Sequence, residues 1–381
     1  MTKIEERKIV CRRDIVCLYR MTPARCAIYS GLAFLLSVAD LRAQNEPPTG
    51  VLISSQAIAL NPVNRKVYAV DESRDAVSII DVATNSSSSV RVGDGPDALS
   101  LNTITGKVYV ANSSSGTVSV LDGEKDRVIA TVNAGPHPYV LAVNEQTDKV
   151  YVTNTFSDAV AVIDGTTNEV SLMKIGSADN VAVDARTNRI FLLGYEDANL
   201  RILNGITGSV EKAQVDEHLW GMAINEATGT VYVTRTGSGD IVELDEKSHS
   251  TTTIPVGAIP CAVAVNAKTN TVYVVNYGDD TVTVIDGKKH KAIATVKVGS
   301  HPQAIAVDAK ANLIYVANTH GNSVTVIDGA SHVVTATLAA GRNPFAITVS
   351  SDARKLYAAN LGYPSFTVVD PAPIGDAARQ K

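Results

Sequence analysis

The sequence predicts an all-β fold, a β-propeller built from four-stranded antiparallel blades, on three observations. A short apolar run led by an aromatic residue recurs eight times, and neighbouring copies begin 40 to 42 residues apart. Each copy also holds runs rich in β-branched residues, separated by turn residues at intervals of about ten residues. Helical periodicity is absent after residue 43. The eight runs begin at Tyr68, Tyr109, Tyr151, Phe191, Tyr232, Tyr273, Tyr315 and Tyr357.

Every repeat of about 41 residues contains the same elements in the same order, and the copy around Tyr315 illustrates them. Its elements are a Gly-x-x-Pro turn (299–302), a first apolar run (304–307), a polar link (308–312), the Tyr-led run, an alternating run (324–327) closed by Asp328-Gly329, and a β-branched run (333–338). Because β-branched and aromatic residues favour a pleated, half-buried surface, each repeat is expected to supply four strands of roughly four to six residues.

The turn residues predict how these strands connect. Gly in a repeated Asp-Gly pair is expected to adopt a positive φ in a tight hairpin. Asn at the end of the Tyr-led run is placed to hydrogen-bond the turn that follows. The Asp-Gly pairs are Asp122-Gly123, Asp164-Gly165, Asp286-Gly287 and Asp328-Gly329, and the Asn residues are Asn112, Asn154, Asn276, Asn318 and Asn360.

Four strands with apolar faces are not stable alone, and stacking such units around an axis buries both faces of each sheet. Eight copies predict eight blades, with seven as the alternative. The eighth copy ends at Val368-Val369-Asp370 and runs into a Pro-rich stretch, so it lacks a fourth strand. A segment ahead of the first copy, Gly50 to Ser54, is a candidate to fill that position and close the ring.

The first 43 residues are typical of a secretory signal peptide. Cys26 to Ala39 carries no charge, is too short to span a bilayer as a helix, and follows a basic segment. Cleavage after Ala43 leaves residues 44–381 as a single propeller domain, and Met21 is an alternative start. We therefore expect a periplasmic or secreted protein with no transmembrane span after cleavage; an uncleaved membrane anchor is the alternative.

Charge and cysteine content restrict the function classes. The chain has 34 basic and 39 acidic residues, and without residues 1–43 it has 26 basic and 35 acidic ones, a net charge of −9. Such a surface repels phosphate backbones, so nucleic acid is not expected as a partner. Cys261 is the one cysteine after residue 43, so no internal disulfide is expected; it is interpreted as a small apolar side chain on a first strand.

The sequence YVTN at Tyr151–Asn154, its variants in the other copies and the VIDG-type turns resemble the YVTN-repeat β-propeller family of exported bacterial and archaeal proteins, the YncE-like propellers. The resemblance covers residues from about 56 to 370. It implies a propeller of the cell envelope, in most members without an established reaction. Its matching residues are structural and do not identify an activity.

A funnel at one end of the axis is the predicted binding site. The links from each fourth strand to the next first strand share this face with the links between second and third strands. Residues flanking the repeated Pro vary there while the framework is kept. The candidate ligand-binding residues are His137, His218, His301 and Asn343 before it, and Tyr139, Trp220, Gln303 and Phe345 after it. They suit a peptide, a protein or a small polar ligand; variable surface loops without a function are the alternative.

The sequence shows no catalytic, metal or cofactor motif: it lacks a Gly-x-Ser-x-Gly elbow, a phosphate-binding loop and a dinucleotide fingerprint. No catalytic residue, metal or cofactor is therefore assigned. His301 and His320 belong to one copy and could approach each other near Asp279 or Asp280. The predicted function is a non-catalytic, exported binding protein; an enzyme or enzyme subunit of the lyase, lactonase or amine-dehydrogenase type, with its site in the same funnel, is the alternative.

Overall fold

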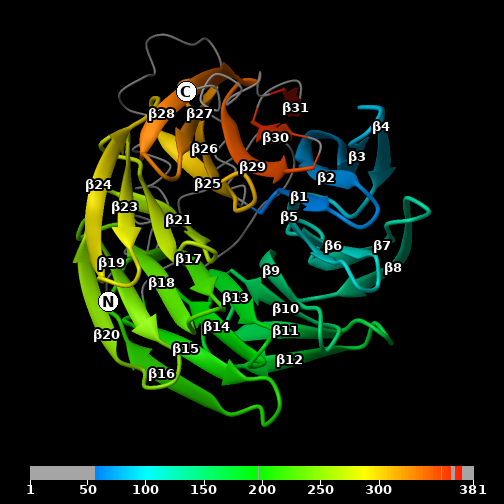
Figure 1. The fold of residues 1–381 in the computed structure, drawn as a ribbon. Coiled ribbons are helices and arrows are strands. Elements are labelled where there is room, and N and C mark those ends of the chain that lie inside the picture. Colours follow the sequence, from blue (N-terminus) through cyan, green and yellow to red (C-terminus); the bar gives the residue numbers. More distant parts are fainter. Residues whose placement is uncertain (1–55, 156, 196, 353, 362–364, 371–381) are drawn as a thin grey trace, which may run out of the picture. The chain divides into compact units, whose positions relative to one another are not determined.

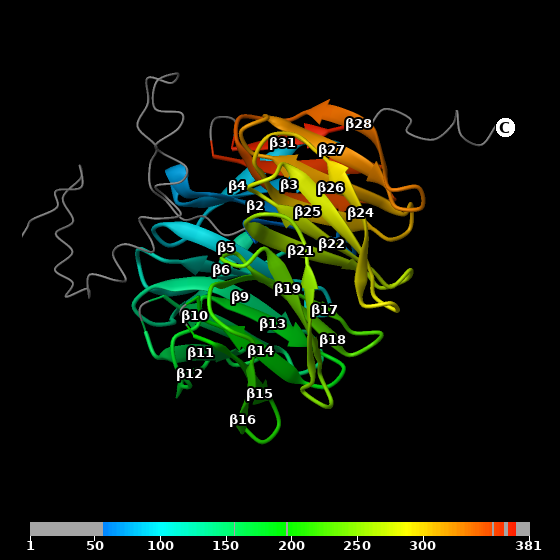
Figure 2. The same ribbon diagram turned by 90° about the vertical axis from the view of Figure 1, so that its left-hand side faces the viewer.

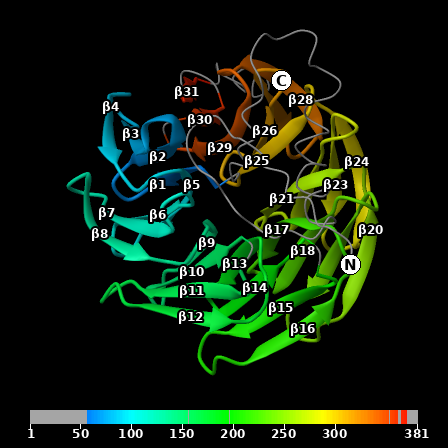
Figure 3. The same cartoon turned by 180° about the vertical axis from the view of Figure 1, so that it is seen from behind.

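The computed structural model describes residues 56–370 apart from 156, 196, 353 and 362–364, and these residues belong to one compact unit. The predicted signal peptide and the proposed closing segment Gly50 to Ser54 lie outside the described residues. Eight antiparallel sheets follow one another in chain order around an axis (Figure 1). The views from the side and from behind show the same succession of blades (Figures 2 and 3).

Strands take four equivalent positions in the blades. The first, innermost strands are β1 (Ile58–Asn61), β5 (Pro96–Asn102), β9 (Pro138–Asn144), β13 (Asn180–Asp184), β17 (Leu219–Asn225), β21 (Pro260–Asn266), β25 (Pro302–Asp308) and β29 (Pro344–Ser350). The second strands are β2 (Lys66–Asp71), β6 (Lys107–Asn112), β10 (Lys149–Asn154), β14 (Arg189–Leu193), β18 (Thr230–Arg235), β22 (Thr271–Asn276), β26 (Leu313–Asn318) and β30 (Lys355–Asn360).

The third strands are β3 (Ala76–Asp81), β7 (Thr117–Asp122), β11 (Ala159–Asp164), β15 (Asn199–Asn204), β19 (Asp240–Asp245), β23 (Thr281–Asp286), β27 (Ser323–Asp328) and β31 (Phe366–Val369). The fourth, outermost strands are β4 (Ser87–Arg91), β8 (Arg127–Asn133), β12 (Val170–Lys174), β16 (Val210–Gln214), β20 (Thr251–Pro255), β24 (Lys291–Lys297) and β28 (Val333–Ala339). Among the described residues the eighth blade has three strands, and the helical content is one 3-10 turn, η1 (Glu72–Arg74).

The ring closes between the last and the first blade, which confirms eight blades. Each first strand contacts the first strand of the next blade, and β29 contacts β1 as well as β25. Lys355 of the eighth blade donates from Nζ to the carbonyl oxygen of Val82 (2.8 Å) and to Oδ1 of Asn85 (2.7 Å) in the first blade. The Ser365 hydroxyl donates to the Asp71 carboxylate (3.1 Å) across the same boundary.

Burial explains why the Tyr-led run is the most regular part of the repeat. The second strands are buried on both faces because a blade packs on each side, whereas outer strands such as β8 and β28 alternate between exposed and half-buried residues. Tyr68, Tyr109, Tyr232, Tyr273 and Tyr357 are almost completely buried. The phenol of Tyr68 crosses to the second blade and donates to the carbonyl oxygen of Gly123 (3.0 Å).

The role predicted for Gly in the Asp-Gly turns is wrong. Gly123, Gly165, Gly287 and Gly329 do not adopt a positive φ; the left-handed residue comes later in each turn, as at Asp126 (φ 50°). Gly is required there for a different reason, since a Cβ at Gly123 would lie 2.6 Å from the carbonyl oxygen of Gly106. The glycine therefore permits a close approach of two turns.

The prediction for the repeated Asn is wrong in its partner, because the side chain bonds residues beyond the following turn and not residues of the turn itself. Nδ2 of Asn276 donates to the hydroxyls of Thr281 and Thr283 (both 2.9 Å) beyond the turn. Its Oδ1 accepts from the backbone N–H of Gly257 (3.1 Å), in the link that leads into β21. The same side chain thus ties together the two kinds of link that the sequence places on one face.

The opposite face is held by amides between neighbouring blades. Nδ2 of Asn102 donates to Asp148 (2.7 Å), Asn144 to Asn188 (2.8 Å), Asn225 to Asn270 (2.7 Å) and Asn266 to Asn312 (2.8 Å). In each pair, the donor ends a first strand and the acceptor lies in the equivalent turn of the next blade. These contacts make that face a repeated framework.

Candidate functional site

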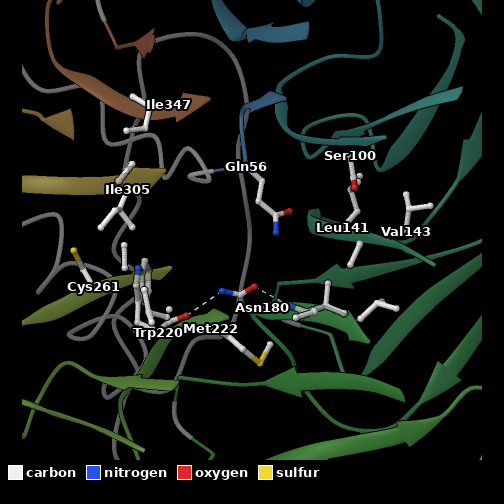
Figure 4. Close-up of a pocket in the computed structure, with 18 residues that line it drawn as sticks. Gln56, Ser100, Leu141, Val143, Asn180, Trp220, Met222, Cys261, Ile305 and Ile347 are labelled. Carbon is white, nitrogen blue, oxygen red and sulfur yellow. Dashed lines mark hydrogen bonds between the residues drawn. The ribbon is translucent and has the colours of Figure 1, made fainter. Parts of the chain in front are cut away.

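A cavity of about 330 Å³ lies on the axis, between the first strands, and its wall extends from Asn180 at the start of β13 to Val143 near the end of β9 (Figure 4). The side chains of Gln56, Asn180 and Trp220 converge on it from three blades, with aliphatic side chains further along the strands. Its wall comprises Gln56, Ser100, Leu141–Val143, Asn180–Val183, Trp220–Met222, Cys261–Val263, Ala304, Ile305 and Ile347. Every one of these residues except Gln56 belongs to a first strand, so the ring itself forms the site.

Irregular pairing accounts for the variable position after the repeated Pro. Pairing of first and second strands shifts by one residue between Pro260 and Ala262, and between Pro302 and Ala304, so that Cys261 and Gln303 have no paired residue opposite. The same bulge occurs at Asp97 in β5 and at Phe345 in β29. A bulge frees its residue from the sheet register and re-aims its side chain, which is why this position tolerates such different residues.

In β9 and β17 the irregularity involves two residues, and a threonine completes the hydrogen bonding. The backbone N–H of Val140 donates to Oγ1 of Thr153 (3.1 Å), and that of Gly221 donates to Oγ1 of Thr234 (2.8 Å). A Cβ at Gly221 would lie 2.8 Å from the carbonyl oxygen of Cys261, so β17 and β21 approach each other closely behind Trp220.

The four residues predicted after the Pro differ in location, and one of them lines the cavity. Trp220 lines the cavity. Phe345 is only 6% exposed and packs into the core with Ile58 and Tyr357, and the Gln303 side chain accepts a hydrogen bond from Thr319 (3.0 Å). Tyr139 does not line the cavity either; burial raises the pKa of its phenol, and the carboxylates of Asp97 and Asp179 add to the rise.

The residues predicted before the Pro lie in the links on the funnel face. His218, His301 and Asn343 adopt left-handed backbone with φ of 64°, 49° and 51°, as do Gly95 and Ile259, whereas His137 does not. Carbonyl oxygens at this position accept the backbone N–H of the second-to-third link of the same blade, as from Thr319 to His301 (3.0 Å). These bonds confirm that both kinds of link share one face.

Two aromatic–imidazole pairs occur at equivalent places. The rings of Tyr195 and His218 lie 5.2 Å apart at 78°, and Trp220 follows at 6.0 Å from Tyr195. Two blades on, Tyr277 and His301 lie 4.9 Å apart at 69°, and His320 is 4.4 Å from His301. The expected approach of His301 and His320 is therefore confirmed, and the His301 backbone N–H donates to Asp280 (2.8 Å).

Asp97 is the most perturbed carboxyl group on this face. Its side chain is 4% exposed, and burial raises its pKa to about 7, with a further rise from Glu72 and a lowering by its hydrogen bond to Ser113. Burial also raises the pKa of Glu72, next to Asp75. Asp97 is not among the residues predicted from the sequence, because only the structure shows that it is buried.

Cys261 fits its predicted role. Its thiol lies 3.6 Å from the carbonyl oxygen of Pro302, and burial raises its pKa to about 12. Such a thiol remains protonated and behaves as an apolar side chain. Among the described residues no group of three or more His, Cys, Asp or Glu side chains is arranged to hold a metal ion.

Charge is distributed unequally between the two ends of the ring. The described links of the funnel face hold ten acidic and two basic residues: Glu72, Asp75, Asp94, Asp158, Asp179, Asp197, Asp216, Glu217, Asp279 and Asp280, against Arg74 and Arg342. The described links of the opposite face hold nine basic and eight acidic residues: Arg65, Lys125, Arg186, Lys247, Lys268, Lys288, Lys289, Lys310 and Arg354, against Glu124, Asp126, Glu145, Asp148, Glu169, Glu226, Glu246 and Asp352.

The family model for the YNCE-like beta-propeller matches residues 98–374. The chain belongs to this family. That assignment confirms the resemblance carried by the YVTN-type runs. No curated protein matches the sequence. In the part of the chain that the structure describes, no helix is long and apolar enough to span a membrane.

Solved structures with the same fold are distant in sequence. Dihydro-heme d1 dehydrogenase NirN in complex with DHE has a TM-score of 0.72 at 15% identity, covering 87% of this chain and 76% of that chain. Saccharomyces cerevisiae Sqt1 gives 0.70 at 10%, covering 84% and 96%. Hydrazine synthase of Kuenenia stuttgartiensis gives 0.58 at 16%, covering 87% and 100%. At such identities the likeness establishes the fold alone.

Proposed function

We propose that this YNCE-like propeller is a non-catalytic binding protein of the cell envelope, which holds a ligand or part of a partner in the axial cavity. The observation that carries the proposal is the contrast within one repeat. The framework residues recur from blade to blade, whereas the residues that reach the cavity at its open end are Gln56, Asn180, Trp220 and Cys261, each of a different kind. Different side chains on a constant framework support selective recognition.

The chemistry of the wall favours a small ligand or a single inserted side chain. A volume of about 330 Å³ is at the lower end of the range for ligand pockets. Amides of Gln56 and Asn180 provide donors and acceptors, the Trp220 indole offers a flat apolar surface, and Met222, Ile305 and Ile347 add aliphatic contacts.

Export remains part of the proposal. It is supported by the signal-like composition of residues 1–43. Expression of the full chain in a bacterial host, followed by fractionation and N-terminal sequencing, tests it. We expect envelope or extracellular protein that begins at Gln44; intact chain in the cytosol would contradict export.

A ligand screen by thermal shift tests the binding role. A ligand bound to the native protein raises its melting temperature by mass action. We expect the shift to be lost in Trp220→Ala and Asn180→Ala and kept in Ile206→Ser, a control whose side chain is 81% exposed on the opposite face. A shift equal in all three variants would place binding elsewhere and refute the proposal.

An enzyme, or the subunit of one, is the second candidate, and Asp97 favours it. A buried carboxyl group with a pKa near 7 is typical of catalytic acids and bases. A panel of lactone and lyase substrates distinguishes the two functions. Turnover that Asp97→Asn abolishes, in a variant that still melts cooperatively, would overturn the non-catalytic proposal.

A further inference from the structure

Most of the acidic residues in the links of the funnel face form no ion pair with a described Lys, Arg or His side chain. Strand cations engage three of them: Arg201 pairs with Asp197, Arg235 with Asp216, and Lys297 with Asp280. Among the described residues, no Lys, Arg or His lies within ion-pair distance of Glu72, Asp75, Asp94, Asp158, Glu217 or Asp279. Charges of one sign around a cleft raise the local concentration of ligands of the other sign.

Two buried groups on the same face have incomplete pairing among the described residues: Asp97 has a hydrogen bond to Ser113 but no ion pair, and Thr155 has an unpaired hydroxyl. Asp97 is 4% exposed and makes no ion pair with a described residue, and its pKa is raised because a carboxylate there is desolvated without a neighbouring cation. Thr155 is 6% exposed, and no described residue is a hydrogen-bond partner of its hydroxyl. The equivalent residue of the seventh blade, Thr319, donates to the carbonyl oxygen of Pro344 in the next blade (2.8 Å). No described residue makes this contact with Thr155, so its hydroxyl is available as a donor and acceptor between the third and fourth blades.

Aromatic residues of the fourth, fifth and sixth blades lie on the funnel face, whereas Asp97 belongs to the second blade. Trp220 lines the cavity and forms an edge-to-face pair with Tyr195, and Tyr277 of the sixth blade is a third aromatic residue. A cation over such a ring is attracted by its quadrupole, more strongly where water is excluded. Carboxylates and aromatic faces together are the groups that recognise ammonium and guanidinium ions.

We propose that the ligand of the funnel is an organic cation, whose amine or guanidinium group is drawn in by the acidic links and held against Trp220 at the mouth of the cavity. This inference rests on the proposed binding function and specifies its ligand class. Two sources offer the same chemistry, a free polyamine and a Lys or Arg side chain of a protein.

The single tryptophan makes a direct test possible, because Trp220 is the only Trp of the chain and lines the cavity. Mature protein is titrated at low salt with spermidine, with a short Arg-rich peptide, with an acidic peptide of equal length and with oligothymidine. We expect the emission of Trp220 to change with one or both cationic probes and to be unaffected by the anionic ones. Spermidine binding alone identifies a free amine, and peptide binding alone identifies a protein segment.

Matched charge variants locate the effect. Glu72→Gln with Asp75→Asn keeps the backbone contact from Gly95 to residue 75, and we expect it to weaken cation binding by about tenfold. Asp158→Asn with Glu217→Gln is a second pair, at exposed positions. Glu124→Gln with Glu169→Gln removes the same charge from the opposite face and is expected to leave binding unchanged.

Three results would overturn the inference: no response to either cation, equal weakening by the control pair, or a response to the anionic probes alone. If an uncharged or anionic ligand from the thermal-shift screen changes Trp220 emission instead, the binding function stands and the cation assignment falls. If no ligand changes the emission or the melting temperature, both fall.

Discussion

The side-chain amide of Asn180 donates a hydrogen bond of 3.0 Å to the main-chain carbonyl oxygen of Trp220, across the boundary between the fourth and fifth blades. Its Oδ1 accepts the backbone N–H of Val181 (2.8 Å), which fixes the orientation of the amide. One polar side chain in the cavity wall therefore holds the strand that carries the indole.

Replacing Asn180 by Ala removes this bridge. We expect the free energy of unfolding to fall by about 1 kcal/mol, because a partly buried carbonyl oxygen loses its donor, and the emission of Trp220 to change. Urea unfolding monitored by fluorescence measures both. Ser100→Ala, at another polar residue of the wall, serves as the control with an effect below about 0.5 kcal/mol. Equal losses in the two variants would contradict the bridge.

Gly221→Ala tests the close approach of β17 and β21. The new methyl group would meet the carbonyl oxygen of Cys261 at 2.8 Å, and backbone on both sides limits relaxation. We expect a loss of about 1–3 kcal/mol in unfolding free energy. Gly208→Ala is the comparison, since its φ of 74° disfavours Ala but open space surrounds it, and about 1 kcal/mol is expected. A smaller loss at 221 than at 208 would refute the packing argument.

Lys355→Met tests ring closure. The ammonium group of Lys355 joins the eighth blade to Val82 and Asn85 of the first, in a partly buried site. Lys310, by contrast, pairs with Asp352 where both side chains are largely exposed (73% and 80%), and such pairs contribute little. Calorimetry should show a lower melting temperature for Lys355→Met. The melting temperature of Lys310→Met should be almost unchanged. Identical melting curves for both variants would mean that Lys355 does not support closure.

Asp97→Asn tests the buried carboxyl group through pH. Because the folded pKa, about 7, is above the unfolded value, the folded protein retains a proton between those two values that the unfolded chain releases. Stability of the natural protein therefore decreases as pH rises through this window, while the variant lacks this contribution. At each pH, the melting temperature of the natural protein is subtracted from that of Asp97→Asn. We expect this difference to increase between pH 4 and pH 8. A constant difference would show that the carboxyl group is not perturbed.

Deleting residues 44–54 tests whether a segment ahead of the first blade supplies the missing outer strand. Among the described residues, β31 pairs only with β30 and its outer edge has no strand beside it. If the segment pairs there, its loss should lower the melting temperature. An unchanged melting temperature in the truncated protein would remove this role from the segment.

Much of the fold follows from the sequence because packing dictates it. An aromatic side chain is buried between blades in each repeat, Tyr68 in the first and Phe191 in the fourth for example, so an aromatic residue recurs at a nearly fixed spacing. The Asp-Gly turns show the limit of this reasoning: the pattern predicts a turn, but glycine is required because of a neighbouring carbonyl oxygen that no local pattern reveals.

The sequence predicts where the site lies in the fold, but not which residues line it. The repeated Pro marks the bulge, so the variable residue after it could be found, and Trp220 does line the cavity. Phe345 occupies the same place in its repeat and points into the core, because the side chains of the adjoining blade decide where each bulge residue goes. Asn180 and Gln56 also line the cavity but are not among the predicted residues, because their place in the wall depends on the assembled ring.

The amide pairs on the face opposite the funnel have a consequence for how the protein comes apart. Each pair links one blade to its successor only, so loss of a single boundary would turn the closed circle into a row with two free ends. The boundary between the eighth and first blades joins segments almost three hundred residues apart in sequence: Ser365 and Asp71, for example, are 294 residues apart. Opening there leaves every local contact in place, and unfolding is therefore expected to start at that junction and spread blade by blade in both directions.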